Sequence, residues 1–276
     1  MLKSLVYNNG IVYGFEFIRK GKHDFIYAEE AKKIISKGNS IIGLSLTFSG
    51  DTWSCLDMDI DSVPKYSFEN DFYSISDGVI TGLTDVAKHF IDLRCEKIIL
   101  PEFVNGMEVV ELGESCFEFS EISSILLPNT LKKINKLAFS RSAISEIAIP
   151  DSCIKIGECA FMECYNLEEL DLGEGVKSIG LGAFYDCRGL DNAEIFIPNS
   201  VEEIGEDAFG VIENAEFTID NSVGNIHTLY GDNDDMEDED YEDEDFDEDY
   251  DELDDFDDGF VEFFYGAYNV KVEYLR

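Results

Sequence analysis

The chain has 276 residues, of which 60 are Asp or Glu and 20 are Lys or Arg, so its formal net charge is −40. This charge repels polyanions, and the sequence therefore disfavours nucleic acid and anionic membranes as partners. Apolar residues make up 45% of the chain and can furnish a sizeable core, but no run of eighteen apolar residues predicts a transmembrane helix.

The N-terminus shows no recognisable secretory signal. The segment "MLKSLVYNNGIVYGFEF" lacks both an uninterrupted apolar stretch and a small-residue cleavage site. We therefore expect a cytoplasmic protein. A processed chain could have lost such a signal, so the cell surface is the alternative if the protein is exported by another route.

Residues 1–62 predict a small α/β module. The segment "GIVYGFEFIR" favours a strand, and "AEEAKKIISKGN" favours a helix that ends at Gly38, a residue suited to a C-terminal cap. The segment "SIIGLSLTFSG" alternates between apolar and small residues, as in a strand. The side chains that we expect on one face of this strand are Ile42, Leu44, Leu46 and Phe48.

Three aspartates alternate with apolar residues in "CLDMDIDS", which invites comparison with a calcium loop. An EF-hand loop needs Gly at its sixth position and Glu at its twelfth, where this chain has Ser62 and Phe68. We interpret the segment instead as a strand with Leu56, Met58 and Ile60 buried. Its aspartates, which are Asp57, Asp59 and Asp61, are then in water.

Residues 66–97 are predicted to form a cap in front of the repeats that follow. In "FYSISDGVITGL", Asp77 and Gly78 stand between two runs of strand-forming residues. Asp-Gly is a strong signal for a two-residue hairpin turn, because both turn positions require positive φ.

Residues 98–230 repeat one pattern five times: an apolar strand ending in Pro or Gly, a variable middle, and Ile-Gly-x-x-Ala-Phe or a near copy. An aromatic and an aliphatic column keep the same steps of 22, 22, 23 and 25 residues. The columns are Phe117, Phe139, Phe161, Phe184 and Phe209, and Leu112, Ile134, Ile156, Ile179 and Ile204. A partial sixth unit, "FTIDNSVGNI", lacks the Phe, as a capping unit allows. One unit cannot bury its own apolar face, so the pattern predicts a solenoid of stacked units.

These motifs, above all "IAIPDSCIKIGECAF" and "IFIPNSVEEIGEDAF", resemble the BspA-like leucine-rich repeats of bacterial and protist surface proteins. The first two units depart from the family pattern with "VVELGESCF" and "INKLAFS". The resemblance implies a β-rich repeat solenoid with a parallel sheet on one face, used for adhesion or partner recognition. It brings no catalytic residues with it.

The seven cysteines cannot all pair within the chain, because their number is odd. Cys164 and Cys187 stand three residues after the Phe column, where the family pattern itself has Cys, and we expect buried, unpaired thiols there. A zinc site built from Cys153, Cys159 and Cys164 is the alternative, but the repeat points these side chains in different directions.

Residues 231–259 contain the second strong feature, an acidic run from Asp232 to Asp258 with twenty Asp or Glu in twenty-seven residues and no Lys or Arg. Such a run repels itself, so it predicts a low-complexity, disordered segment. Strand-like patterns return in residues 260–276, which we expect to form a hairpin or cap over the last repeat. The acidic segment is then a loop rather than a tail.

No catalytic motif is recognisable, and we predict no enzyme, no cofactor and no metal site. His23, His89 and His227 lie in three separate modules without a Cys, Asp or Ser partner at a motif spacing, so we expect surface or cap positions. The glycines of "LGEGVKSIGLGAF" lack the Gly-Lys-Ser/Thr of a phosphate loop.

Side chains between the buried strand residues are expected to project from the exposed sheet face of the solenoid. One row there is partly apolar, and its neighbour becomes a ladder of four glutamates, which repel one another unless a cation or a basic ligand screens them. The residues that we assign to partner binding are Ile99, Leu126, Asp171 and Phe196 in the first row and Glu146, Glu169, Glu194 and Glu216 in the second.

The sequence therefore predicts a non-enzymatic recognition module that binds a protein partner, of basic character, through this face. The alternative is an acidic decoy or inhibitor that acts through the Asp/Glu-rich run. Such a protein would imitate nucleic acid or bind cations with low affinity.

Overall fold

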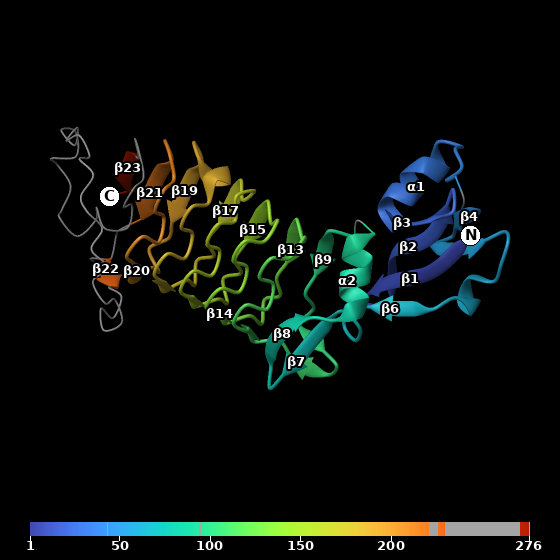
Figure 1. The fold of residues 1–276 in the computed structure, drawn as a ribbon, viewed down its shortest axis with the longest axis horizontal. Coiled ribbons are helices and arrows are strands. Elements are labelled where there is room, and N and C mark those ends of the chain that lie inside the picture. Colours follow the sequence, from blue (N-terminus) through green and yellow to red (C-terminus); the bar gives the residue numbers. More distant parts are fainter. Residues whose placement is uncertain (43, 94, 221–225, 230–270, 276) are drawn as a thin grey trace, which may run out of the picture.

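The computed structural model describes residues 1–42, 44–93, 95–220, 226–229 and 271–275. They form an elongated molecule, with an α/β module at the N-terminal end, a cap that contains a helix, and a β-solenoid that extends from the cap (Figure 1). The predicted acidic segment, residues 231–259, lies outside the described residues.

The N-terminal module is built on a four-stranded sheet of order β3-β2-β1-β6, in which only the β1–β6 pair is parallel. Its strands are β1 (Leu2–Asn8), β2 (Ile11–Arg19), β3 (Lys22–Tyr27) and β6 (Lys65–Ser67). Helix α1 (Ala28–Ser36) and the hairpin of β4 (Leu46–Ser49) and β5 (Thr52–Cys55) enclose a small core on one face. In that core Trp53 lies edge-on against Phe15, with ring centroids 4.6 Å apart. Helix α1 stops where the sequence predicts, because Gly38 adopts φ 74°.

Two predicted strands of this module are wrong in part. Ile42 is 66% exposed, because the chain turns between Ile41 and Leu44 before β4 begins. Leu56 is 77% exposed, because the segment with the three aspartates is a turn followed by the 3-10 helix η1 (Ile60–Ser62). The Asp59 carboxylate accepts a hydrogen bond from the Asp61 N–H at 3.0 Å, and this local bond favours the turn over an extended chain.

The cap begins with the predicted hairpin, in which β7 (Tyr73–Ser76) and β8 (Val79–Leu83) are antiparallel. Asp77 and Gly78 form its turn with φ values of 50° and 82°. A helix that the sequence analysis missed follows, α2 (Asp85–Asp92). The Thr84 hydroxyl caps it by accepting a hydrogen bond from the Ala87 N–H at 3.2 Å. With eight residues, the helix carries too short a pattern to stand out in the sequence.

The second face of the N-terminal sheet packs against the cap. Phe25 on β3 contacts Phe90 on α2, with ring centroids 5.9 Å apart. Beside them, the Tyr13 hydroxyl donates to the Lys97 carbonyl oxygen at 2.7 Å, and the Tyr27 hydroxyl accepts from the Lys97 N–H at 3.1 Å. Burial raises the pKa of Tyr27 to about 12, so this phenol stays neutral. The module is therefore joined to the first strand of the solenoid by apolar packing and by hydrogen bonds between two tyrosine hydroxyls and the Lys97 backbone.

The solenoid carries parallel strands on two sides of one continuous core (Figure 1). The longer sheet continues the cap hairpin in the order β22-β20-β18-β16-β14-β12-β8-β7, and the other side carries two sheets, β17-β15-β13-β9 and β19-β21-β23. The longer sheet adds β12 (Glu111–Leu112), β14 (Lys133–Ile134), β16 (Lys155–Ile156), β18 (Ser178–Ile179), β20 (Glu203–Gly205) and β22 (His227–Leu229). The other side has β9 (Lys97–Ile99), β13 (Ser124–Leu126), β15 (Glu146–Ala148), β17 (Glu169–Asp171), β19 (Glu194–Ile197), β21 (Glu216–Asp220) and β23 (Lys271–Leu275). A small hairpin of β10 (Phe103–Val104) and β11 (Met107–Glu108) follows β9.

The predicted aromatic column is a continuous stack of rings inside this core. Neighbouring centroids from Phe117 to Phe209 are 5.1, 5.0, 5.1 and 5.2 Å apart, and each ring is at most 1% exposed. Tyr73 of the cap covers one end of the stack edge-on, and Phe217 covers the other. The aliphatic column is in register along the longer sheet. The predicted repeat register is therefore confirmed.

Each repeat also holds two residues in the left-handed region, two positions before and two after its Phe, with φ between 51° and 63°. They are Ser115, Leu137, Cys159, Gly182 and Asp207 before the Phe, and Phe119, Arg141, Glu163, Asp186 and Val211 after it. These left-handed residues, spaced along the turn, direct every second backbone N–H towards the next repeat. The Phe139 N–H, for example, donates to the Ala160 carbonyl oxygen at 2.7 Å. The ladder holds non-glycine residues in a conformation that they otherwise avoid.

At the C-terminal end, β21 and β22 form the partial sixth unit, and β23 adds a parallel strand to β21. The predicted terminal hairpin is thus represented by one strand, since residues 260–270 lie outside the described residues.

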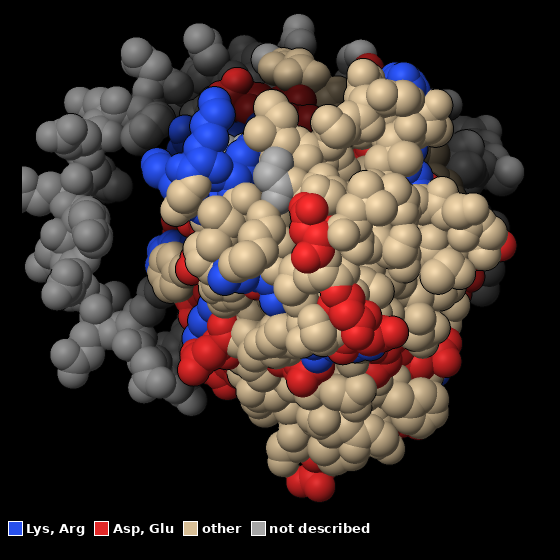
Figure 2. Space-filling view, turned by 90° about the vertical axis from the view of Figure 1, so that its right-hand side faces the viewer, with Lys and Arg blue, Asp and Glu red and all other residues tan. Residues whose placement is uncertain are grey.

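The N-terminal module carries little of the net negative charge of the chain, because residues 1–62 contain seven Lys or Arg and eight Asp or Glu. Figure 2 looks onto that N-terminal end and shows Lys and Arg side chains gathered along one edge of a largely uncharged surface.

Candidate binding face

The face formed by β9, β13, β15, β17, β19 and β21 presents the two predicted rows. Glu146 and Glu169 are register partners, as are Ala148 and Asp171, and Ile99 and Leu126. Glu194 is paired with Glu216, and Phe196 with Thr218. The residues between the rows point into the core and are buried, among them Ile98, Ile125, Ile147, Ile195 and Phe217. Strand alternation therefore places all eight residues of the predicted site on the outer side of the strands.

The glutamate row is only partly balanced by positive charge. The Lys97 Nζ lies 3.9 Å from the Glu146 Oε1. Ser124 on the intervening strand β13 is the register partner of both residues. Among the described residues, Glu169 and Glu194 form no ion pair. At the far end, Lys271 of β23 is the register partner of Glu216. The row thus has a lysine near Glu146 and, in its middle, two carboxylates without an ion pair among the described residues.

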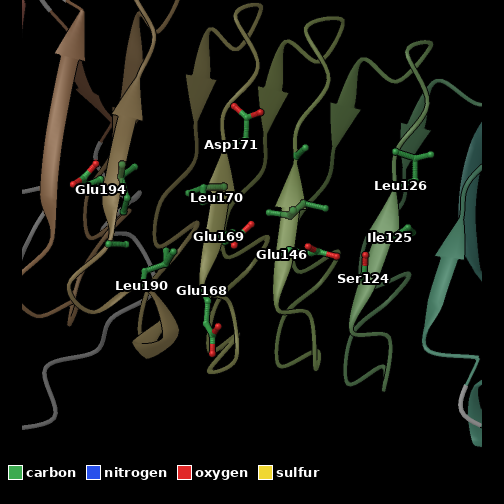
Figure 3. A pocket seen from close by; sticks show the side chains of 14 residues that line it. Ser124, Ile125, Leu126, Glu146, Glu168, Glu169, Leu170, Asp171, Leu190 and Glu194 are labelled. Carbon is green, nitrogen blue, oxygen red and sulfur yellow. The ribbon is translucent and has the colours of Figure 1, made fainter.

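A shallow groove of about 600 Å³ hollows this face (Figure 3). It crosses β13, β15 and β17 and continues to β19, which belongs to a separate sheet. The repeat between these sheets is longer than the others, with 25 residues from Phe184 to Phe209, and it contains the 3-10 helix η2 (Arg188–Leu190). Leu190 and the half-buried Leu170 line the groove at this break.

The structure separates the predicted residues into two groups. Leu126, Glu146, Glu169, Asp171 and Glu194 line the groove, together with Glu168, which the sequence analysis did not assign (Figure 3). Ile99, Phe196 and Glu216 lie outside it on the same face. Leu126 is 63% exposed and Phe196 is 40% exposed.

A second charged row follows the turns after the Phe stack. Arg141 donates two hydrogen bonds to Glu163, at 2.7 and 3.0 Å, and the Tyr165 hydroxyl donates a third at 2.7 Å. These bonds lower the pKa of Glu163 to about 2. Arg141 also lies over the ring of Phe119, and Arg188 over that of Tyr165. The charges in this row satisfy one another, unlike those of the groove.

The three histidines are exposed, with His89 in the cap, as expected, but two of them share a partner that the sequence does not signal. His23 on β3 and His89 on α2 both contact the Glu16 carboxylate on β2, with nitrogen-to-oxygen distances of 2.5 and 3.3 Å. No motif spacing signals this cluster, because Glu16 and His89 are 73 residues apart in the chain and only the packing of α2 on the sheet joins them. His227 lies on β22, at the opposite end of the molecule.

The cysteines behave as small apolar residues. All seven are unpaired, and Cys164 and Cys187 are fully buried as predicted. Each of these two thiols donates a hydrogen bond at 3.1 Å to the carbonyl oxygen of a stacked Phe in the preceding repeat, Phe139 for Cys164 and Phe161 for Cys187.

No group of three or more His, Cys, Asp or Glu side chains in the described part of the chain is arranged to hold a metal ion. Within the same residues, no helix has the length and apolar character needed to cross a membrane.

The repeats match a known family. Residues 110–230 match the family described as the BspA type leucine rich repeat region, in six copies. No curated protein is significantly similar to the chain.

Several solved structures are similar. A leucine-rich repeat protein of T. pallidum is 25% identical, over 53% of this chain and 68% of that one, with a TM-score of 0.43. One from Bacteroides ovatus is 21% identical, over 64% of this chain and 47% of that one, with a TM-score of 0.36. The pneumococcal vaccine antigen PcpA is 15% identical, over 84% of this chain and 39% of that one, with a TM-score of 0.36. The chain thus spans less than half the length of the last two.

The six matched copies, the repeated Phe and Ile columns and the parallel strands on two sides of one core agree with one another. Residues 110–230 therefore form a BspA-type leucine-rich repeat region.

Proposed function

We propose that the protein is a non-enzymatic recognition module that binds a basic segment of a partner protein in the groove of the solenoid. The observation that carries this proposal is the juxtaposition of uncompensated carboxylates and exposed apolar side chains around one groove. A ligand that carries Lys or Arg next to an apolar residue would screen the carboxylates and cover the apolar surface at the same time.

The distribution of charge supports a ligand at the middle of the row. Glu169 and Glu194 flank the break between the two sheets and have no ion pair among the described residues, whereas Glu146 is already near Lys97. A Lys or Arg side chain placed at the break would lie between these two carboxylates and lay its aliphatic part over the half-buried Leu170. Glu168 at the edge of the groove adds a further negative charge.

The exposed apolar residues provide anchors on either side of the break. Leu126 lies at one end of the groove, and Phe196 lies beyond the other on β19. Desolvated anchors of this kind provide most of the affinity in protein interfaces, while peripheral charges chiefly affect association rate and specificity. We therefore assign affinity to Leu126 and Phe196, and specificity for a basic ligand to the glutamates.

The test is affinity capture from a lysate of the source cells, at low and moderate salt, with the captured protein then titrated against variants. Replacement of Glu169 and Glu194 by Lys is expected to weaken binding at least tenfold at low salt, since each buried or half-buried charge contact contributes about 1 kcal/mol or more. The matched control replaces the exposed Glu114 and Glu174, which lie outside the groove, by Lys and so makes the same change in net charge. Equal binding by both double variants would contradict the proposal.

The rival function, an acidic decoy, depends on the run from Asp232 to Asp258. Replacing that run with a Gly/Ser linker separates the two: binding through the groove survives the replacement, and binding through the run does not. If the partner no longer binds when the run is replaced, but still binds the Glu169→Lys/Glu194→Lys variant, the decoy function is favoured.

The cytoplasmic location and the cell-surface alternative both stay predictions, which localisation of the tagged protein in source cells would decide.

A further inference from the structure

The outer face of the longer sheet carries lysines that the solenoid itself does not pair. Residues 98–230 contain seven Lys or Arg, and four of these form ion pairs within the solenoid. The paired residues are Lys136, Arg141, Lys177 and Arg188. The other three, Lys132, Lys133 and Lys155, form no ion pair within the described part of the chain, and they lie together at β14 and β16. We call these three residues the lysine stripe.

The stripe brings like charges together on neighbouring strands. Lys133 and Lys155 are register partners on β14 and β16, and like charges so placed repel one another. The register partner of Lys133 on its other side is Glu111, whose carboxylate accepts a hydrogen bond from the Asn135 side chain at 3.1 Å. Next to Lys155, Ile154 is 46% exposed. A ligand for the stripe should therefore carry several negative charges together with apolar side chains.

The chain itself contains a segment of this chemistry. The run from Asp232 to Asp258 has twenty Asp or Glu and no Lys or Arg, and it also contains aromatic residues. These are Tyr241, Phe246, Tyr250 and Phe256. The run begins three residues after Leu229, the last residue of β22, and β22 belongs to the same sheet as β14 and β16. Figure 1 shows β14, β20 and β22 along the same side of the solenoid.

The length of the chain beyond β22 is sufficient for the run to reach the stripe. β16 is the third strand from β22 and β14 the fourth, so about 14 to 19 Å separate them at about 4.8 Å per strand. The connection from β22 to β23 has 41 residues, and an extended chain covers about 3.3 Å per residue. The other side of the solenoid repels the run, because Glu146, Glu169 and Glu194 lie there. Charge and length thus both direct the run to the longer sheet.

We propose that the acidic run from Asp232 to Asp258 docks on the lysine stripe of its own chain. Its carboxylates pair with the three lysines, and its aromatic side chains cover Ile154. The tether favours this contact over an external acidic ligand, because it holds the run near the stripe at an effective concentration on the order of millimolar. The run is then bound on the side of the solenoid that faces away from the groove.

The first test uses a fluorescently labelled peptide with the sequence of residues 232–258. Its partner is the full chain in which the same residues are replaced by a Gly/Ser linker. Fluorescence anisotropy should show that the peptide binds this linker chain and that binding weakens as salt is added. The wild-type chain is expected to bind the peptide at least about tenfold more weakly, because its own run occupies the stripe. Equal binding by the two chains would overturn the proposal.

Substitutions in the linker chain locate the peptide. Replacement of the three lysines of the stripe by Gln is expected to weaken peptide binding at least about tenfold, since three charge contacts are lost. The matched control makes the same change in net charge at Lys20, Lys22 and Lys37, which are exposed on the N-terminal module. Circular dichroism checks that both triple variants are folded. Unchanged binding by the stripe variant, or an equal loss in the control, would contradict the assignment.

Carbodiimide cross-linking, which joins an amine to a carboxylate in direct contact, tests the intact wild-type protein. Mass spectrometry should find Lys132, Lys133 or Lys155 joined to the acidic run at low salt, whereas Lys20 and Lys22 should stay at background. In an equal mixture of isotopically light and heavy protein, each link should join two peptides of the same isotope. Links that join light to heavy peptides would place the run on a second copy, and the proposal would then be wrong.

Discussion

The ring of Phe139 lies on the ring of Phe161, with 5.0 Å between their centroids and 8° between their planes. The separation is close to the roughly 4.8 Å between neighbouring strands of a sheet, because each repeat contributes one strand per sheet and one ring to the core. The backbone ladders thus set the distance between the rings. Removal of one ring therefore leaves a gap that its neighbours cannot close without stretching the ladders on both sides.

Phe161→Ala is expected to destabilise the protein by about 3 to 5 kcal/mol, the usual cost of deleting a buried aromatic side chain whose cavity cannot collapse. Urea unfolding followed by far-UV circular dichroism measures this change. Phe103→Ala is the control, since Phe103 is 50% exposed on β10 and its loss should cost about 0.5 kcal/mol or less. Similar costs for the two variants would mean that the stack does not support the fold.

Cys159 and Gly182 occupy the same left-handed position of successive repeats, with φ values of 51° and 55°. Cys159→Gly relieves backbone strain and is expected to be neutral or to stabilise by up to about 1 kcal/mol, whereas Gly182→Ala is expected to destabilise by about 1 kcal/mol. A Cβ at Gly182 would meet nothing closer than 3.4 Å, so this cost is conformational rather than steric. Thermal or urea unfolding of the two single variants checks the opposite signs. Changes of the same sign would contradict the argument.

The Arg141–Glu163 pair predicts a particular dependence on pH. The pKa of Glu163 is lowered from 4.5 to about 2, so the pair adds stability above pH 4.5 and loses it as the pH falls towards 2. The stability difference between the wild type and Arg141→Gln should thus be largest near neutral pH, should be small because solvent screens so exposed a pair, and should shrink in acid.

NMR of the side-chain carboxyl carbons measures the titration of Glu163 directly. In Arg141→Gln, the titration of Glu163 should move towards higher pH, because the largest of the interactions that lower its pKa is gone. Lys177→Gln, which removes a different inter-repeat ion pair, should leave the Glu163 titration unchanged. An unaltered titration in Arg141→Gln would show that other groups lower this pKa.

Thiol labelling tests the environment of the cysteines. Burial raises the pKa of Cys164 to about 11 and that of Cys116 to about 12, so at pH 8 these thiols are both inaccessible and protonated. In the native protein, a disulfide reagent is expected to modify the half-buried Cys55 and Cys159 first, and all seven cysteines only after denaturation. Peptide mass spectrometry assigns the labels. Labelling of native Cys164 as fast as that of Cys55 would contradict the structure.

The sequence by itself determined the repeat unit and its register. The Phe column from Phe117 to Phe209 recurs at steps of 22 to 25 residues. The same side chains stack in the core, because each unit must bury its apolar face against similar neighbouring units. The hairpin at Asp77 and Gly78 was equally local, since two adjacent residues fix the turn. Strand alternation also gave the two exposed rows.

Only the tertiary structure decided where those rows are interrupted and which distant residues meet. The groove lies where β17 and β19 belong to separate sheets, and no pattern in the strands signals this break. Helix α2 and the turns near Ile42 and Leu56 depend on single hydrogen bonds and short patterns that periodicity does not resolve. Glu16, His23 and His89 carry no common spacing, because residues in separate elements become neighbours only when the N-terminal sheet packs its second face on the cap, driven by apolar burial that no local motif records.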